Sequence, residues 1–162
     1  MKILALEFSS RQRSLAVTDD TDVLSEITTD QLKTSPLVLI EQALDQAQIN
    51  REEIQCLALG IGPGSYTGIR SAIAVAQGWQ LAWDTPLCAV SSAEILAATA
   101  RRNGLRGKTH FIIDAQRHEY YHCAWQLDDQ AQLETTPFSI IDVTSAAELK
   151  TCGPDAADFP SC

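Results

Sequence analysis

The sequence of 162 residues lacks the features that mark zinc-binding, membrane and nucleic-acid-binding proteins. It has no Cys-x-x-Cys pair, and only His118 and His122 stand at a ligand spacing, so a zinc site is not expected. It has no apolar run near the ~20 residues that a membrane-spanning helix needs, so no membrane segment is expected. It has no excess of positive charge. Its net charge of −9 argues against direct, unaided binding to nucleic acid, where Lys and Arg must neutralise phosphate.

The composition is that of a soluble globular protein, because 45% of the residues are apolar and 20% are charged. The length suits one domain or two small lobes. Met1 and Lys2 lead straight into a strand-like run, so we expect no signal peptide and a cytoplasmic location. The five cysteines are an odd number, and Cys56 and Cys88 lie in apolar runs. Buried, reduced thiols are therefore expected.

The chain is organised around a glycine-rich turn between an apolar strand over residues 54–61 and an uncharged helix that ends at Trp83. Glycines supply turn dihedrals that other residues resist, and Ser65 or Thr67 can cap the helix. The start of a helix also attracts anions. The turn is nevertheless neither a Walker A motif nor a Rossmann fingerprint. A structural turn is the favoured reading, and the candidate anion-site residues are Gly62, Gly64, Ser65, Thr67 and Gly68.

Two helices have more apolar surface than one sheet can cover. The helix after the turn is apolar all round, with one face predicted over Ile69, Ile73, Ala76, Gln80 and Trp83. The helix over residues 36–49 has a wide apolar arc. We expect the second face of each to meet a partner chain. The predicted partner surface contains Leu37, Ile40, Leu44, Ala47, Ser71, Ala74, Val75, Gly78, Leu81 and Ala82.

The order of elements indicates an α/β fold. Strands are predicted over residues 2–7, 14–18 and 23–28, followed by helix, strand, helix, strand and helix, which gives βββαβαβα. A lobe boundary is expected at residues 105–108, which separates a first lobe (1–105) from a small, short or truncated second lobe (106–162). The second lobe is predicted to hold strands 109–114, 119–127 and 139–143, a helix over 144–150, and a terminal loop.

Four stretches together resemble the TsaB (YeaZ) family. They are the strand Ile3–Ser9, the glycine turn through Arg70 with Ala76-Gln77-Gly78, the segment Val90-Ser91-Ser92 before a helix, and Asp114–Tyr120. The resemblance covers residues 1–127. It implies an actin-like (ribonuclease H-like) mixed sheet. Three features depart from the family pattern: Glu7 replaces its Asp, Thr34-Ser35 replaces His-Ser, and the second lobe is shorter.

The resemblance also implies a role. Members of the family take part in making threonylcarbamoyladenosine at position 37 of tRNAs that read ANN codons. They act as a non-catalytic dimerisation partner of the catalytic subunit TsaD, and the ATPase TsaE joins the pair. The resemblance implies that this chain meets TsaD through its first two helices, contacts tRNA only indirectly, and pairs with itself when alone. No cofactor is expected, apart from a nucleotide at the partner interface.

The alternative reading is a stand-alone actin-like ATPase or small-molecule kinase. It would need a second carboxylate beside Glu7 and a phosphate-binding loop, and Asp114 is the only well-placed candidate acid. The histidines are expected to be surface or half-buried groups and not metal ligands, and Arg11 and Arg13 to be solvated charges. No catalytic residue and no metal ligand is therefore predicted.

Overall fold

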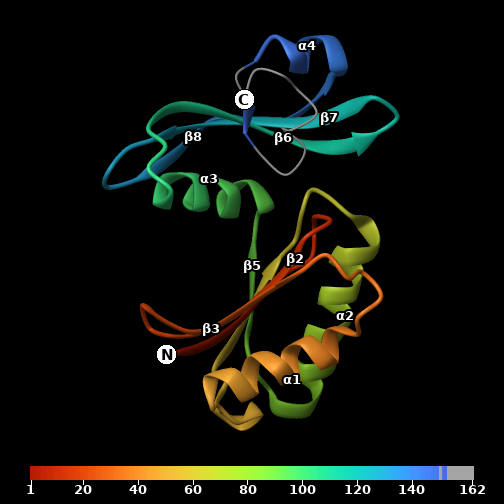
Figure 1. The fold of residues 1–162 in the computed structure, drawn as a ribbon, viewed down its shortest axis with the longest axis vertical. Helices are drawn as coiled ribbons and strands as arrows, with labels where there is room; N and C mark the ends of the chain where they lie inside the picture. The colour runs from red at the N-terminus through yellow and green to blue at the C-terminus, as the bar shows by residue number, and fades with distance from the viewer. Residues whose placement is uncertain (150, 153–162) are drawn as a thin grey trace. The chain divides into compact units, whose positions relative to one another are not determined.

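The computed structural model describes residues 1–149 and 151–152. The chain separates into two compact units, Met1–Ser91 and Ser92–Cys162, and each unit has its own sheet (Figure 1). The fold is α/β, as predicted.

The first unit is built on a five-stranded mixed sheet of order β3-β2-β1-β4-β5. β1, β2 and β3 form an antiparallel meander, β4 pairs parallel to β1, and β5 pairs parallel to β4. This is the mixed sheet that the family resemblance implied. The strands are β1 (Lys2–Glu7), β2 (Arg13–Asp19), β3 (Asp22–Thr29), β4 (Cys56–Gly60) and β5 (Leu87–Val90).

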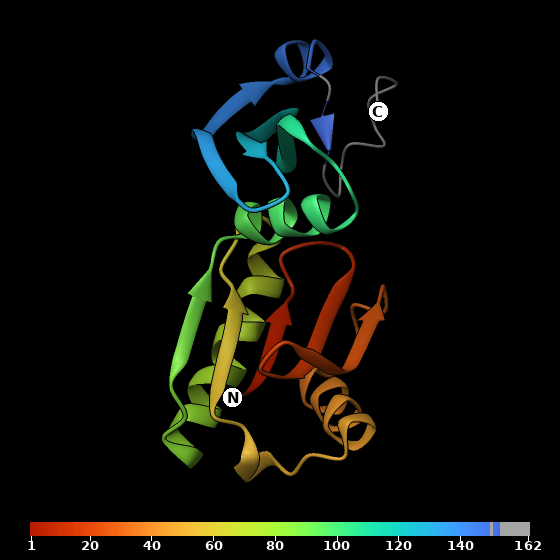
Figure 2. The same cartoon turned by 90° about the vertical axis from the view of Figure 1, so that its left-hand side faces the viewer.

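Two helices, α1 (Pro36–Ala47) and α2 (Tyr66–Trp83), lie on one face of this sheet and contact each other (Figure 2). A short 3-10 turn, Arg51–Glu53, precedes β4. Successive side chains of a strand point to opposite faces, so alternate residues of each strand meet the helices. The buried core they form includes Leu4, Leu6, Phe8, Leu15, Val17, Leu57 and Leu59 from the strand segments, and Leu39, Ile40, Ala43, Leu44, Ala72, Ala76 and Trp79 from the helices.

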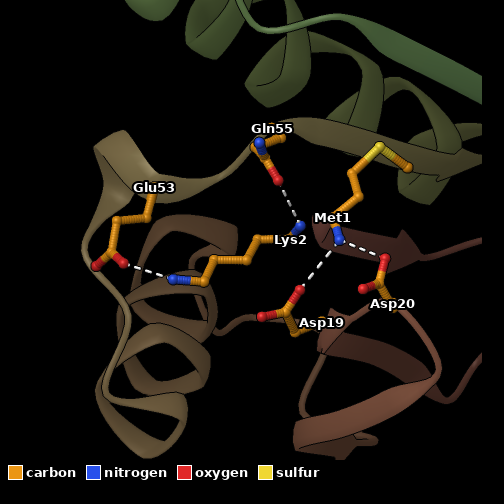
Figure 3. Close-up of polar contacts among 6 residues, drawn as sticks. All are labelled: Met1, Lys2, Asp19, Asp20, Glu53 and Gln55. Atoms are coloured by element: carbon orange, nitrogen blue, oxygen red, sulfur yellow. Dashed lines mark hydrogen bonds and ion pairs between the residues drawn. The ribbon is translucent and has the colours of Figure 1, made fainter.

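Polar contacts hold the start of β1 to its neighbours (Figure 3). The N-terminal ammonium of Met1 lies 3.1 Å from Asp19 Oδ1 and 2.5 Å from Asp20 Oδ1. Lys2 Nζ donates to Glu53 Oε1 at 2.6 Å, and this hydrogen bond lowers the pKa of Glu53 and raises the pKa of Lys2. The groups are exposed or half-buried at the surface, so water and salt weaken these ion pairs and they add little to the stability of the fold.

The second unit contains a four-stranded sheet of order β8-β7-β6-β9. β6, β7 and β8 are antiparallel, and β9 pairs parallel to β6. Ala93, Ala97 and Ala100 of the first helix in this unit pack with Phe111, Cys123 and Leu127 of the sheet. The elements are α3 (Ser92–Arg102), β6 (Gly107–Gln116), β7 (Glu119–Leu127), β8 (Gln132–Asp142), α4 (Val143–Ala147) and β9 (Thr151–Cys152).

The division of the chain differs from the one predicted. We expected the boundary at residues 105–108, whereas α3 falls in the second unit, because its alanines share a core with β6 and β7. β8 begins at Gln132, earlier than the strand predicted over 139–143, and α4 ends at Ala147. Cys152, which we assigned to the terminal loop, lies in β9. The rest of that predicted loop, residues 153–162, lies outside the described residues.

The cysteines and histidines also differ in part from expectation. Cys88 is exposed, because β5 is an edge strand, whereas Cys56 is half-buried and Cys123 fully buried. His118 is exposed, as expected of a surface histidine. His110 and His122 form a hydrogen bond between Nδ1 and Nε2 of 2.9 Å, and burial lowers the pKa of both rings. At least one of the two rings is neutral, because a hydrogen bond between two ring nitrogens needs one nitrogen that accepts.

Cys123 makes the stability of the second unit depend on pH. Burial raises the pKa of its thiol from 9.0 to about 11. The stabilising contribution of the neutral buried thiol is therefore complete below pH 9 and is lost as the pH rises toward 11. Between pH 8 and pH 10 we expect a loss of about 1 kcal/mol.

Hydrogen exchange of β7 peptides at pH 8 and pH 10, corrected for the intrinsic exchange rate, measures this loss. The variant Cys123→Ala has no thiol, so its stability should fall less over the same interval. Equal losses in the two proteins would mean that Cys123 is not the titrating group.

Candidate functional site: the glycine turn and the outer face of α2

The glycine turn joins β4 to α2 with a backbone that favours glycine. Gly62 and Gly64 have φ values of +89° and +147°, a region that residues with a Cβ rarely adopt. Ser65 caps the helix, since its Oγ accepts a hydrogen bond from the Gly68 amide at 3.3 Å. Of the two caps that the sequence allowed, the structure uses Ser65.

The start of α2 packs directly against the backbone that follows β1. The Ser65 amide donates to the Ser9 carbonyl at 2.6 Å. A Cβ on Gly68 would overlap the carbonyl oxygen of Phe8, and one on Gly64 would overlap that of Ser9. Gly62 and Gly68 are buried, while Ser65 and Thr67 are exposed. The glycines are therefore explained by a close backbone contact, which supports the structural reading of the turn over an anion site.

Glu7 and Asp114, the two acids that the ATPase or kinase alternative would use, each accept a hydrogen bond from a backbone amide two residues further along the chain. Glu7 Oε1 accepts from the Ser9 amide at 2.6 Å, and the carboxylate lies over Gly60, where a Cβ would overlap it. In the other unit, Asp114 Oδ1 accepts from the Gln116 amide at 2.7 Å. Among residues 1–149 and 151–152, no three His, Cys, Asp or Glu side chains form a group that could hold a metal.

From Ser71 onward, α2 buries one narrow stripe and exposes an uncharged surface opposite it, whereas the exposed Arg70 lies one turn earlier. The buried residues are Gly68, Ala72, Ala76 and Trp79. The apolar face that we predicted from Ile69 to Trp83 does not coincide with this stripe, since its members Gln80 and Trp83 are exposed. On the other side of the helix, four exposed residues form what we call the α2 outer strip: Ala74, Gly78, Leu81 and Ala82. Leu81 is 90% exposed.

The other predicted interface residues are divided between core and surface. Ile40 and Leu44 of α1 are buried in the core of the first unit, so they are not available at its surface. Leu37 is 60% exposed, and Ala47, Ser71 and Val75 are half-buried. The remaining exposed positions of α1 include Glu41 and Asp45, so its outer side is more polar than that of α2.

Arg13 is a residue whose position we predicted wrongly. It is only 7% exposed and lies on the helix-covered face of the sheet, not in solvent. The alternation Arg13, Leu15, Val17 along β2 could have indicated this, because side chains two residues apart in a strand share a face.

Within the described residues, none of the helices combines the length and the apolar character needed to cross a bilayer.

Comparisons with known proteins agree with this fold. The family model for TsaD, tRNA N6-adenosine threonylcarbamoyltransferase, matches residues 15–154. The tRNA threonylcarbamoyladenosine biosynthesis protein TsaB of Escherichia coli is 30% identical over 131 residues, which is 80% of this chain and 57% of that protein. TsaB of Bacillus subtilis is 33% identical over 132 residues, 78% of this chain and 56% of that protein. The chain thus spans little more than half the length of these curated relatives.

Comparison with solved structures also finds proteins of the YeaZ type. YeaZ from Pseudomonas aeruginosa superposes with a TM-score of 0.78 at 29% identity, covering 87% of this chain and 66% of that chain. An uncharacterized protein from the same organism, described as similar to peptidase YeaZ, superposes with a TM-score of 0.80 at 26% identity and covers 98% of this chain and 80% of that chain. The strand order, the glycine turn and these similarities together show that the chain belongs to the TsaB (YeaZ) family and has its actin-like fold.

Proposed function

We propose that this chain takes part in the biosynthesis of tRNA threonylcarbamoyladenosine, the process for which its relatives in Escherichia coli and Bacillus subtilis are named. The product would be the modified adenosine at position 37 of tRNAs that read ANN codons. Family membership and the shared fold support this proposal.

Within that process, we propose a non-catalytic role as a partner of a TsaD-type catalytic subunit. The observation that carries this proposal is the α2 outer strip, which is uncharged and exposed along two turns of helix. Soluble proteins seldom leave a contiguous apolar surface on a helix without a partner. Its small residues, Ala74, Gly78 and Ala82, would let a second helix approach closely, and Leu81 would supply the apolar contact.

We also propose the further associations that the family resemblance implies, and the first of them uses the α2 outer strip. When the catalytic subunit is absent, two copies of this chain would pair through it. A TsaE-type ATPase would join the heterodimer, and any nucleotide would bind where the subunits meet. The net charge of −9 favours indirect contact with tRNA, with the partner supplying the positive surface. The proposed location is the cytoplasm.

The test is to measure association and ATP turnover of the purified chain, alone and with a TsaD-type subunit. We expect self-association without turnover. Ala74→Glu or Gly78→Glu should weaken both self-association and heterodimer formation by at least about a hundredfold, because an unpaired charge buried at an interface costs ~3–5 kcal/mol.

The matched control is Gln80→Glu, since Gln80 is exposed on the same helix but lies away from the α2 outer strip. It adds the same charge and should leave association unchanged. A monomer that turns over ATP rapidly, with or without these substitutions, would instead favour the actin-like ATPase or kinase.

A further inference from the structure

Five residues of α2 and its C-cap form a row with the spacing of a coiled-coil seam. They follow one another at alternating steps of four and three residues, and all five are exposed: Arg70, Ala74, Gln77, Leu81 and Asp84. Residues at this spacing share one side of a helix, and two such rows can pack along each other. We call these five residues the heptad row. It shares Ala74 and Leu81 with the α2 outer strip.

The two charged residues of the heptad row stand at its ends and have opposite signs. Arg70 comes seven residues before Gln77 and Asp84 seven residues after it, so each lies about 10 Å along the helix from the middle of the row. Neither is in an ion pair within the described part of the chain. Arg70 donates to the hydroxyl of Tyr66 one turn earlier, at 3.4 Å, and Tyr66 carries no charge. Both charges are therefore available to a second chain.

This pattern complements itself when two copies of the helix run in opposite directions. A two-fold axis at Gln77 places Arg70 of one copy beside Asp84 of the other, and the symmetry makes this pair twice. The same arrangement brings the small side chain of Ala74 close to the large one of Leu81 in the other copy. Parallel helices would instead place Arg70 beside Arg70 and Asp84 beside Asp84, and like charges repel.

We propose that two copies of this chain associate through an antiparallel pair of α2 helices, and that two Arg70–Asp84 ion pairs between the copies fix its direction. The inference rests on the proposed self-association through the α2 outer strip and adds the orientation of the two chains. Gly78 lies next to the axis, where a Cβ would meet nothing within 4 Å of its own chain, so the second helix can approach closely. Charges at the edge of such a contact contribute to its register more than to its affinity.

The test reverses each charge separately and then mixes the two variants. Arg70→Glu places acid against acid at both ends of the helix pair, and Asp84→Arg places arginine against arginine. We expect each variant alone to self-associate about tenfold more weakly than the unmodified chain in sedimentation equilibrium. In an equimolar mixture opposite charges meet again at both ends, so association should return to that of the unmodified chain. A folding defect in either variant could not produce this recovery, because the mixture contains the same chains.

Two controls separate the ion pairs from other effects. Asp84→Arg makes a chain of net charge −9 less negative, so long-range repulsion alone would give tighter association and not weaker. Arg102→Glu makes the same charge change as Arg70→Glu at an exposed residue of the other unit, and it should leave association unchanged.

The outcomes distinguish this inference from the proposal on which it rests. The antiparallel pair alone is overturned if Gly78→Glu disrupts association but either charge variant associates as tightly as the unmodified chain. It is also overturned if the mixture associates no more tightly than its two components. An unmodified chain that stays monomeric, or an association that Gly78→Glu leaves intact, overturns the proposed self-association through α2 together with the ion pairs.

Discussion

Replacing Gly68 by alanine is expected to destabilise the first unit by about 3 kcal/mol. Gly68 lies in the first turn of α2, and the new methyl group would overlap the carbonyl oxygen of Phe8. A backbone oxygen cannot turn aside as the end of a long side chain can, so the helix or the segment after β1 must move, and overpacking of this kind costs ~1–3 kcal/mol or more. The Ser65–Ser9 hydrogen bond, which joins the same two segments, should weaken as well.

Gly78→Ala is the matched control, because it makes the same substitution in the same helix. A Cβ at Gly78 would meet nothing within 4 Å. We expect this variant to be more stable than the unmodified chain by ~0.5–1 kcal/mol, the usual difference between alanine and glycine in a helix interior. Urea unfolding followed by tryptophan fluorescence measures both variants. Equal effects of the two substitutions would show that the contact between α2 and Phe8 is not tight.

Replacing Phe8 by alanine is expected to destabilise the first unit by about 3–5 kcal/mol. Phe8 is fully buried, and its ring lies between the core and the guanidinium of Arg13. The substitution removes the burial of an aromatic ring, leaves a cavity, and takes away the ring that lies beside a buried cation. The denaturant midpoint should fall without a comparable change in slope.

Tyr66→Ala separates the effect of burial from that of the cation–ring contact. Tyr66 is 72% exposed, and the guanidinium carbon of Arg70 lies 5.2 Å from its ring centroid, the same distance that separates Arg13 from Phe8. An exposed contact of this kind is worth ~0.5–1 kcal/mol, so the loss should not exceed about 1 kcal/mol. A loss at Phe8 as small as that at Tyr66 would contradict the packing described here.

The order of the first eight elements could be predicted because each carries its own local signal. Strand alternation, the glycine turn and Pro36 at the start of α1 are all short-range patterns. β8 was predicted too short for a physical reason. It is an edge strand that carries Pro137 at an irregularity in its pairing with β7, and its polar residues face solvent. Proline is tolerated at such a position, although in sequence it suggests that a strand has ended.

The candidate site was less predictable, because its geometry depends on contacts between distant parts of the chain. α2 is apolar all round, so its periodicity could not indicate which side meets the sheet, and the predicted face was displaced from the buried stripe. Ile40 and Leu44 were assigned to the partner surface because the apolar arc of α1 is wide, although both are core residues. The burial of Arg13 could have been inferred from its alternation with Leu15 and Val17 in β2, whereas its contact with Thr34 depends on the fold and is contained in no local pattern.

The carboxylate of Glu7 occupies the space above Gly60 that a methyl group would need. The resemblance to the TsaB family leads one to expect aspartate at position 7, which is shorter by one methylene. Glutamate fits here because the neighbouring strand ends in a residue without a side chain. Positions 7 and 60 should therefore covary among close homologues: where residue 60 has gained a methyl group, the acid opposite it should have become shorter.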